Sequence, residues 1–181
     1  MHPFNVYLPM FEEVILSFSK GCSEYFYREW KRMPETELAH LLQHYDLSKI
    51  EKIIVVGAGA IPFTALYLSK HLRKPAYALE RNSITYHACR QLMRRMNARG
   101  VRVVKASGES FEEYENSLVI IVLQVCLKQS VMEKALRGGN IVVVRVPLAN
   151  TGEKFESIAL KGREHTSVEH DSPSMISVFL A

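Results

Sequence analysis

The first candidate functional residues along this chain are two glycines. Gly57 and Gly59 directly follow a short apolar run at residues 53–56. Glycine permits a sharp turn and lets a ligand approach the backbone without meeting a Cβ atom. The pattern after the glycines predicts a helix, whose first N–H groups have no partner inside the helix. The sequence therefore predicts a ligand-binding turn between a strand and a helix.

The turn differs from the pattern that binds dinucleotides. A dinucleotide site continues to a third glycine, because the pyrophosphate lies against the N-terminus of the helix. Pro62 stands at this point, and proline removes one N–H group from a phosphate cradle. We therefore expect a ligand without a pyrophosphate, and a nicotinamide oxidoreductase is a distant alternative.

An acidic side chain stands where a ribose would need one. Glu80 directly follows the second apolar run, at residues 76–79, and an acid roughly 20 positions beyond such glycines accepts hydrogen bonds from ribose hydroxyls. A carboxylate offers acceptors to both hydroxyls of a diol. The alternative is a structural turn without a ligand, followed by an acid that offsets the dipole of the next helix. The order of strand, turn, helix, strand and acid favours the nucleoside site.

Five apolar runs predict the scaffold that positions these residues. Continuous apolarity indicates strands buried on both faces, as in a parallel sheet. Helical patterns separate the runs, for example at residues 83–99, where Gly100 is the expected C-cap. This alternation predicts an α/β fold with a Rossmann-like doubly wound sheet of five parallel strands. The runs are residues 53–56, 76–79, 101–104, 118–123 and 141–146.

The two ends of the chain follow other patterns. Residues 165–169 and 175–180 predict two strands joined by a turn at residues 171–174, which should pair as a C-terminal antiparallel hairpin. The first 50 residues predict helices, at residues 23–33 and 34–46. In the second helix one face carries Leu38, Leu41, Leu42 and Tyr45.

These patterns predict two parts. Residues 1–50 form a helical N-terminal cap, and residues 51–181 form the Rossmann-like domain. The apolar face of the cap needs a partner surface, so we expect it to cover the ligand cleft.

From Lys52 onward the chain resembles the class I S-adenosylmethionine-dependent methyltransferases. The glycine turn, the acid after the second strand and the closing hairpin carry the resemblance. It implies that the turn lies under the methionine part of the cofactor S-adenosylmethionine and that the acid holds its ribose. Segments after the third and fourth strands would flank the adenine and line the methyl-donor pocket. The cofactor-binding residues predicted in this way are Gly57, Ala58, Gly59, Ala60, Glu80, Arg81, Ser107, Gly108, Glu109, Gln124 and Val125.

A second similarity is to nicotianamine synthases. Their glycine loop also runs into proline and a helix start rich in Thr and Ser, as in GAGAIPFTALYLSK, and the later segment VMEKALRGGNIVVVRV is also similar. The chain departs from that family after Arg145, where VPLANTG replaces a polar stretch that contains histidine. This similarity implies aminocarboxypropyl transfer from S-adenosylmethionine as an alternative to methyl transfer.

We predict a methyltransferase that uses S-adenosylmethionine and acts on an unidentified acceptor, which we expect to be a small molecule. No catalytic base is evident. Many amino-group methyltransferases carry an Asn/Asp-Pro-Pro-Tyr/Phe signature after the fourth strand, where this chain has LQVC at residues 123–126. This difference argues against N-methylation of adenine or glutamine. The alternatives are the aminocarboxypropyl transferase and a non-catalytic module that binds S-adenosylmethionine.

Two further groups of residues could bind ligands. His40 and His44 have the spacing of metal ligands, but no third ligand is evident and we expect no metal. A net charge of +4 is compatible with RNA binding. We interpret the basic stretch as the solvated face of a helix and RNA contact as the less favoured alternative. Its members are Arg90, Arg94, Arg95, Arg99, Arg102 and Lys105.

The cysteines predict the compartment. Cys22, Cys89 and Cys126 are odd in number and widely spaced, which indicates free thiols in a reducing environment. The first 20 residues are interrupted by prolines and acids, and they lack the pattern of a signal peptide or a membrane span. We therefore expect a cytoplasmic protein without a membrane partner.

Overall fold

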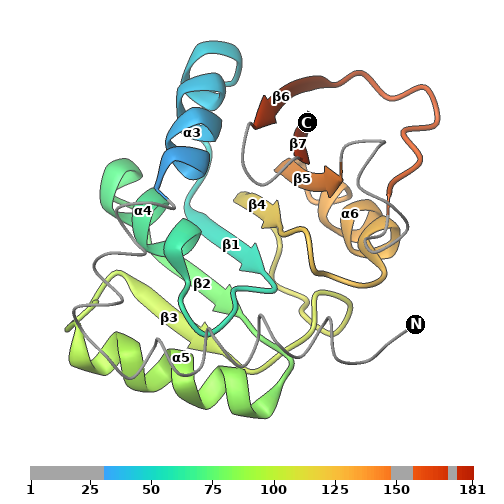
Figure 1. The fold of residues 1–181 in the computed structure, drawn as a ribbon. Coiled ribbons are helices and arrows are strands. Elements are labelled where there is room, and N and C mark those ends of the chain that lie inside the picture. Colours follow the sequence, from blue (N-terminus) through green and yellow to red (C-terminus); the bar gives the residue numbers. More distant parts are fainter. Residues whose placement is uncertain (1–30, 148–156, 171–174) are drawn as a thin grey trace.

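The computed structural model describes residues 31–147, 157–170 and 175–181. Figure 1 shows a central sheet with helices on both sides. The elements are α3 (Arg32–His44), β1 (Lys52–Val56), α4 (Phe63–Leu72), β2 (Ala76–Leu79), α5 (Ser83–Arg95), β3 (Val101–Val104), β4 (Ser117–Ile121), α6 (Lys128–Leu136), β5 (Ile141–Pro147), β6 (Thr166–His170) and β7 (Met175–Leu180).

Seven strands form one sheet in the order β3-β2-β1-β4-β5-β7-β6. The first five are parallel, and β7 pairs antiparallel with both β5 and β6. The predicted Rossmann-like sheet with a C-terminal antiparallel hairpin is therefore confirmed. The strand order reverses between β1 and β4, and open α/β sheets bind ligands at such a point, beyond the carboxyl ends of the strands.

Alternate residues of each strand face two separate cores. Ile53 and Val55 pack in the core that also holds residues of α3 and α4, whereas Ile54 and Val56 pack in the core that holds residues of α6. Burial on both faces explains why these strands are continuously apolar, without polar alternation. The helix predicted at residues 34–46 corresponds to α3, which ends at His44. Its Leu41 is fully buried against the first core, but Leu42, expected on the same apolar face, is 62% exposed.

The largest difference between a predicted and an observed boundary concerns α5. The helix expected at residues 83–99 ends at Arg95, with Met96 as its C-cap, so Gly100 does not cap it. Asn97 has the left-handed conformation, with a φ of 51°, and asparagine tolerates this conformation better than most residues. Gly100 has a different role, because a Cβ atom there would lie 2.6 Å from the hydroxyl oxygen of Ser69.

Some expectations fall outside the described residues. These are most of the helix at residues 23–33, the turn at residues 171–174, and Cys22. Cys89 is buried and Cys126 is exposed. None of the helices in the described segments combines the length and the apolarity that crossing a bilayer requires.

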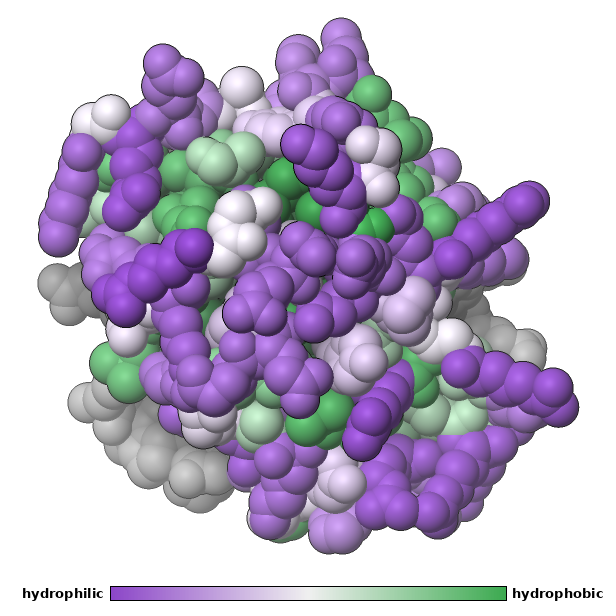
Figure 2. Space-filling model, turned by 180° about the vertical axis from the view of Figure 1, so that it is seen from behind, coloured by the Kyte–Doolittle hydropathy of each residue, from purple (hydrophilic) through white to green (hydrophobic). Residues whose placement is uncertain are grey.

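The face opposite to the view of Figure 1 is predominantly hydrophilic, with small apolar areas between long polar side chains (Figure 2).

Candidate functional site

The glycine turn is anchored to the end of the neighbouring strand. Gly57 and Gly59 have φ angles of 79° and 71°, which glycine adopts without strain. The N–H groups of Gly57 and Ala58 both donate to the carbonyl oxygen of Leu79, at 3.0 Å. The turn therefore sits at the carboxyl edge of the sheet, between the ends of β1 and β2.

Glu80 connects the same turn to the start of α5. One carboxylate oxygen accepts the N–H of Gly59 at 3.2 Å, and the other accepts the N–H of Asn82 at 2.8 Å. Asn82 in turn caps α5, since its side-chain oxygen accepts the N–H groups of Ile84 and Thr85. Each carboxylate oxygen has a second lone pair, so the acid retains acceptors for a diol. Glu80 is 8% exposed, and the backbone holds it in a defined position.

The start of α4 is a poor cradle for phosphate. Pro62 is the N-cap residue and has no N–H group. The next N–H, that of Phe63, donates to the carbonyl oxygen of Ile61 at 2.9 Å. At the start of α4, one backbone N–H group that could face a pyrophosphate is thus missing and the next is already hydrogen-bonded. This agrees with the expectation of a ligand that has no pyrophosphate.

The segment after β4 packs directly on the glycine turn. A Cβ atom on Gly57 would lie 2.6 Å from a methyl carbon of Val125 and 2.9 Å from one of Val122. The structure therefore brings Val125 and Gly57 together, whereas Gln124 is exposed. Arg81 reaches the next residue of this segment, because its guanidinium donates to the sulfur of Cys126 at 3.6 Å.

The segment after β3 is held mainly by its own contacts and by α6. The hydroxyls of Ser107 and Ser110 lie 3.1 Å apart, and the carbonyl oxygen of Glu109 accepts from Lys134 at 2.7 Å. A Cβ atom on Gly108 would meet methyl carbons of Val131 at 2.7 Å and of Val56 at 2.8 Å. Gly108 is thus required for packing on the end of β1, and an adenine contact by this segment stays a prediction.

Tyr114 holds the segment after β3 through a hydrogen bond. Its hydroxyl donates to the carbonyl oxygen of Gly108 at 2.8 Å. Burial raises the pKa of Tyr114 well above its usual range, and the nearby charges of Glu109 and Glu112 act in the same direction. The hydroxyl therefore stays protonated and remains a donor at physiological pH.

A buried polar cluster includes a residue of α4, the helix that follows the glycine turn. Both carboxylate oxygens of Glu37 accept from the guanidinium of Arg145, each at 2.8 Å. The same guanidinium donates to Thr64, in the first turn of α4, at 2.9 Å. We call this group the Glu37 cluster, and its members are Glu37, Thr64, Arg145, His170 and Ser177.

The Glu37 cluster joins α3, α4, β5, β6 and β7. Ser177 lies opposite Arg145 in the register of β5 and β7, and its hydroxyl donates to Glu37 at 2.6 Å. His170 shares a hydrogen bond with that hydroxyl at 2.9 Å. Burial opposes ionisation of Glu37, but the charge and hydrogen bonds of Arg145 outweigh it, with help from Ser177 and His170, and the pKa of Glu37 is lowered. The acid is therefore an anion with its acceptors engaged, which suits positioning rather than proton transfer.

The similarity to nicotianamine synthases points to Arg145 but not to its partner, Glu37. Glu37 stands 108 positions away in the chain. A signal for it was present, since Met33, Glu37 and Leu41 are four residues apart and all three are buried on one side of α3. An acid in the middle of an apolar helix stripe indicates a buried cationic partner.

The two histidines of α3 contact each other and a residue of β6. Their rings lie 4.3 Å apart, and the Nε2 atom of His40 hydrogen-bonds to the hydroxyl of Thr166 at 2.7 Å. Burial lowers the pKa of His40, and the nearby His44 lowers it further. Across the part of the chain that the structure describes, no cluster of three or more His, Cys, Asp or Glu residues could hold a metal ion.

Several solved structures have a fold similar to that of this chain. A mutant of the nicotianamine synthase MtNAS in complex with S-adenosylmethionine matches 97% of this chain and 74% of its own, with 18% identity and a TM-score of 0.72. A SAM-dependent methyltransferase from Aquifex aeolicus matches 81% of this chain and 87% of its own, with 15% identity and a TM-score of 0.58.

An RNA methyltransferase from Salinibacter ruber, in complex with S-adenosyl-L-homocysteine, matches 80% of this chain and 89% of its own at 10% identity, with a TM-score of 0.58. No protein-family model and no curated protein matched the sequence. At these identities the likeness concerns the fold, and it confirms the fold that both sequence resemblances implied.

Proposed function

We propose that the protein binds S-adenosylmethionine at the carboxyl edge of its sheet and transfers one of the groups on its sulfur. The observation that carries the proposal is the position of Glu80, which is tied to the glycine turn through the N–H of Gly59. The methionine part would lie along Gly57, Ala58, Gly59 and Ala60, and the ribose diol would bind Glu80. The sulfonium activates the adjacent carbons, so the protein has mainly to align a nucleophile with one of them.

The rest of the proposed pocket comes from neighbouring segments. Val125 packs on Gly57 and would bound the pocket on the side of β4. Arg81, Ser107, Glu109 and Gln124 would contribute to the rim. Three solved structures of similar fold contain S-adenosylmethionine, S-adenosyl-L-homocysteine or MTA, which supports a ligand of this class here.

Calorimetric titration of the full chain tests this proposal. We expect heat on addition of S-adenosylmethionine or S-adenosylhomocysteine and none with NAD. Glu80→Gln should weaken nucleoside binding by about 1.5–3 kcal/mol, roughly tenfold or more, because a charge-assisted pair of hydrogen bonds is lost. The matched control is Glu113→Gln, at an exposed acid. Equal affinity for wild type and a folded Glu80→Gln variant would remove this acid from the site.

Methyl transfer is the first candidate reaction. A nucleophile on the acceptor attacks the methyl carbon, the carbon–sulfur bond breaks, and S-adenosylhomocysteine leaves with the electron pair on its sulfur. Several structures of similar fold are methyltransferases, including those from Aquifex aeolicus and Salinibacter ruber. The acceptor would be a small molecule.

Aminocarboxypropyl transfer is the second candidate, and one observation favours it. The match to MtNAS extends over 97% of this chain with TM-scores of 0.72 and 0.74, against 0.53 to 0.59 for five other solved structures of similar fold. In this reaction the nucleophile attacks the amino-acid-side carbon next to sulfur, and methylthioadenosine leaves.

The nucleoside product distinguishes the two reactions. The protein is incubated with S-adenosylmethionine and a panel of amines and amino acids, and the nucleosides are separated by chromatography. S-adenosylhomocysteine formed only with enzyme and acceptor supports methyl transfer, and methylthioadenosine alone supports the second reaction. Binding with neither product favours the non-catalytic module.

A further inference from the structure

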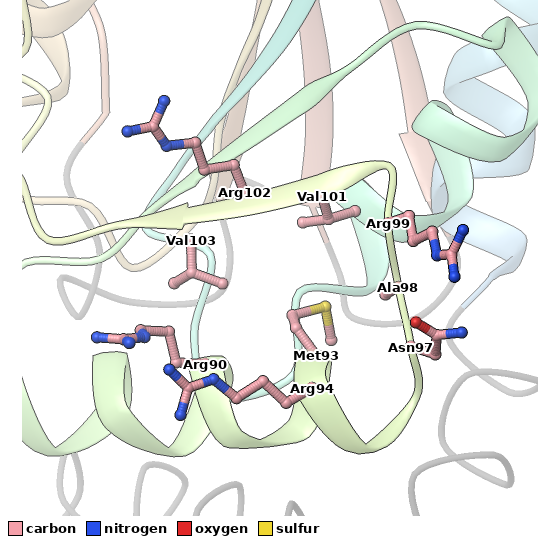
Figure 3. A pocket seen from close by; sticks show the side chains of 9 residues that line it. All are labelled: Arg90, Met93, Arg94, Asn97, Ala98, Arg99, Val101, Arg102 and Val103. Carbon is pink, nitrogen blue, oxygen red and sulfur yellow. The ribbon is translucent and has the colours of Figure 1, made fainter.

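A shallow groove of about 440 Å³ lies at the outer edge of the sheet, away from the proposed nucleoside site. It runs between the second half of α5 and β3, the first strand in the sheet order. Asn97, Ala98 and Arg99, which precede β3, line one end of the groove. Because β3 runs parallel to β1 and β2, this end lies at the amino edge of the strands. We call the whole groove the arginine groove. The residues that line it are Arg90, Met93, Arg94, Asn97, Ala98, Arg99, Val101, Arg102 and Val103 (Figure 3).

All charged side chains that line the arginine groove are positive. It contains four arginines and no acidic residue. Within the described segments none of the four forms an ion pair, and Arg90 has only a neutral neighbour, the ring and hydroxyl of Tyr86. All four are exposed. Unpaired guanidinium groups on an open surface are ready donors to an anion, and they match phosphate oxygens in a bidentate manner.

A helix dipole does not account for this arrangement. Cations in the last turn of a helix offset its negative end, and this explanation covers Arg94. It does not cover Arg99 and Arg102, which lie beyond α5, the second of them on β3. The helix and the turn after it thus present three arginines to the groove, and Arg102 stands on the edge strand that borders it.

The arrangement of the side chains favours an extended ligand. Figure 3 shows Arg90 and Arg94 on α5 at one end, Arg99 beside Asn97 at the other, and Arg102 on the strand above them. The guanidinium groups of Arg90, Arg94 and Arg99 are spread along the groove and do not converge on one point, whereas that of Arg102 projects from the face of β3 turned away from α5. Met93 and Val103 lie between helix and strand as an apolar floor. A compact phosphate would meet one or two of these groups, whereas a phosphodiester chain would meet them in succession.

Asn97 suggests which phosphodiester chain would bind. Its side chain is exposed at the end of the groove and carries both donors and an acceptor. The 2′-hydroxyl of ribose is likewise a donor and an acceptor, and it is the group by which proteins distinguish RNA from DNA. We propose that the arginine groove is a docking surface for single-stranded RNA, with the arginines on phosphates and Asn97 on a ribose. This proposal does not depend on the transferase reaction.

Fluorescence anisotropy of the full chain with a labelled oligouridine of about 12 nucleotides tests the proposal. The logarithm of the affinity should fall linearly with the logarithm of the salt concentration, by roughly 0.7 per phosphate contact on a single strand. The double variant Arg94→Gln/Arg99→Gln should bind on the order of tenfold more weakly, with a salt slope reduced by about 1.4. No saturable binding by the wild type would overturn the proposal.

The matched control removes the same charge elsewhere. Arg32→Gln/Arg137→Gln changes two exposed arginines on α3 and at the end of α6, and it should leave the affinity within about twofold of wild type. If both double variants lose affinity equally, the attraction comes from net charge and the groove is not the site. Titration with S-adenosylmethionine and circular dichroism of each variant separate this result from a loss of fold or of the proposed nucleoside site.

The choice of RNA over DNA has its own test. Wild type should bind the oligouridine more tightly than the deoxyribose strand of matching sequence. Asn97→Gly keeps the left-handed backbone conformation at this position and should abolish the preference while leaving the salt slope unchanged. Equal affinity of the wild type for both strands would overturn the assignment of RNA as the ligand, and a preference that survives in Asn97→Gly would overturn the role of Asn97.

Discussion

Arg145 and the arginines of the arginine groove carry the same guanidinium group in opposite surroundings. Arg145 is 5% exposed and is paired inside the fold with Glu37 and Thr64. The groove arginines are exposed, and among the described residues they meet no carboxylate. A buried charge costs several kcal/mol in desolvation and persists because its partners are fixed around it. An exposed and unpaired charge costs little and remains free for a ligand.

The largest effect is expected where the buried pair is broken. Arg145→Met should lower the free energy of unfolding by about 3–5 kcal/mol, because it leaves the carboxylate of Glu37 buried without a cation. Urea denaturation at neutral pH measures this loss. The double variant Glu37→Leu/Arg145→Met should recover a large part of it, since no uncompensated charge remains. A double variant as unstable as Arg145→Met would show that packing, and not charge, sets the cost.

Acid should produce a smaller loss through the same cluster. The pKa of Glu37 in the folded protein lies below its ordinary value of 4.5, so the folded state binds fewer protons at this site than the unfolded state. The corresponding stability is present above that value and is lost as the pH falls through the lowered pKa. Wild type should therefore lose more stability than Glu37→Gln between neutral pH and about pH 3. Parallel acid profiles of the two proteins would contradict this role.

The smallest effect on stability is expected in the arginine groove. Arg94→Gln/Arg99→Gln should change the free energy of unfolding by no more than about 0.5 kcal/mol, because both side chains are exposed and unpaired among the described residues. Thermal and urea denaturation provide the measurement. A loss comparable to that of Arg145→Met would mean that these arginines hold the fold together, and the contrast between the two surroundings would disappear.

Strands were predictable here because burial on both faces leaves a simple sequence record. The apolar run at residues 76–79 coincides with β2, and the hairpin strand expected at residues 175–180 coincides with β7. The run at residues 101–104 coincides with β3 as well, although its Arg102 is exposed. The end of α5 was not predictable in this way. Both Asn97 and Gly100 can end a helix, and the choice depends on the close approach of Gly100 to Ser69, which is a tertiary contact.

The candidate site likewise has a part that is local in the sequence and a part that depends on tertiary contacts. The glycine turn and Glu80 are local features, and the hydrogen bond between Gly59 and Glu80 places them together as the strand–turn–strand pattern suggested. The Glu37 cluster depends on a strand order that brings residues from five elements together. Its pattern in α3 was visible, but the identity of its partner needed the topology. The binding roles of Ser107, Glu109 and Gln124 stay predictions, because the contacts of this rim depend on a ligand.

The order of the last strands also bears on how the chain is made. β7 pairs with β5 on one side and β6 on the other, although β6 precedes it in the chain. During synthesis β6 therefore emerges before the strand that connects it to the sheet. Until residues 175–180 have left the ribosome, the outer edge of β5 has no antiparallel partner and its hydrogen-bonding groups stay open. Such an edge can pair with another chain, so a chain whose β7 has not yet docked exposes β5 to aggregation.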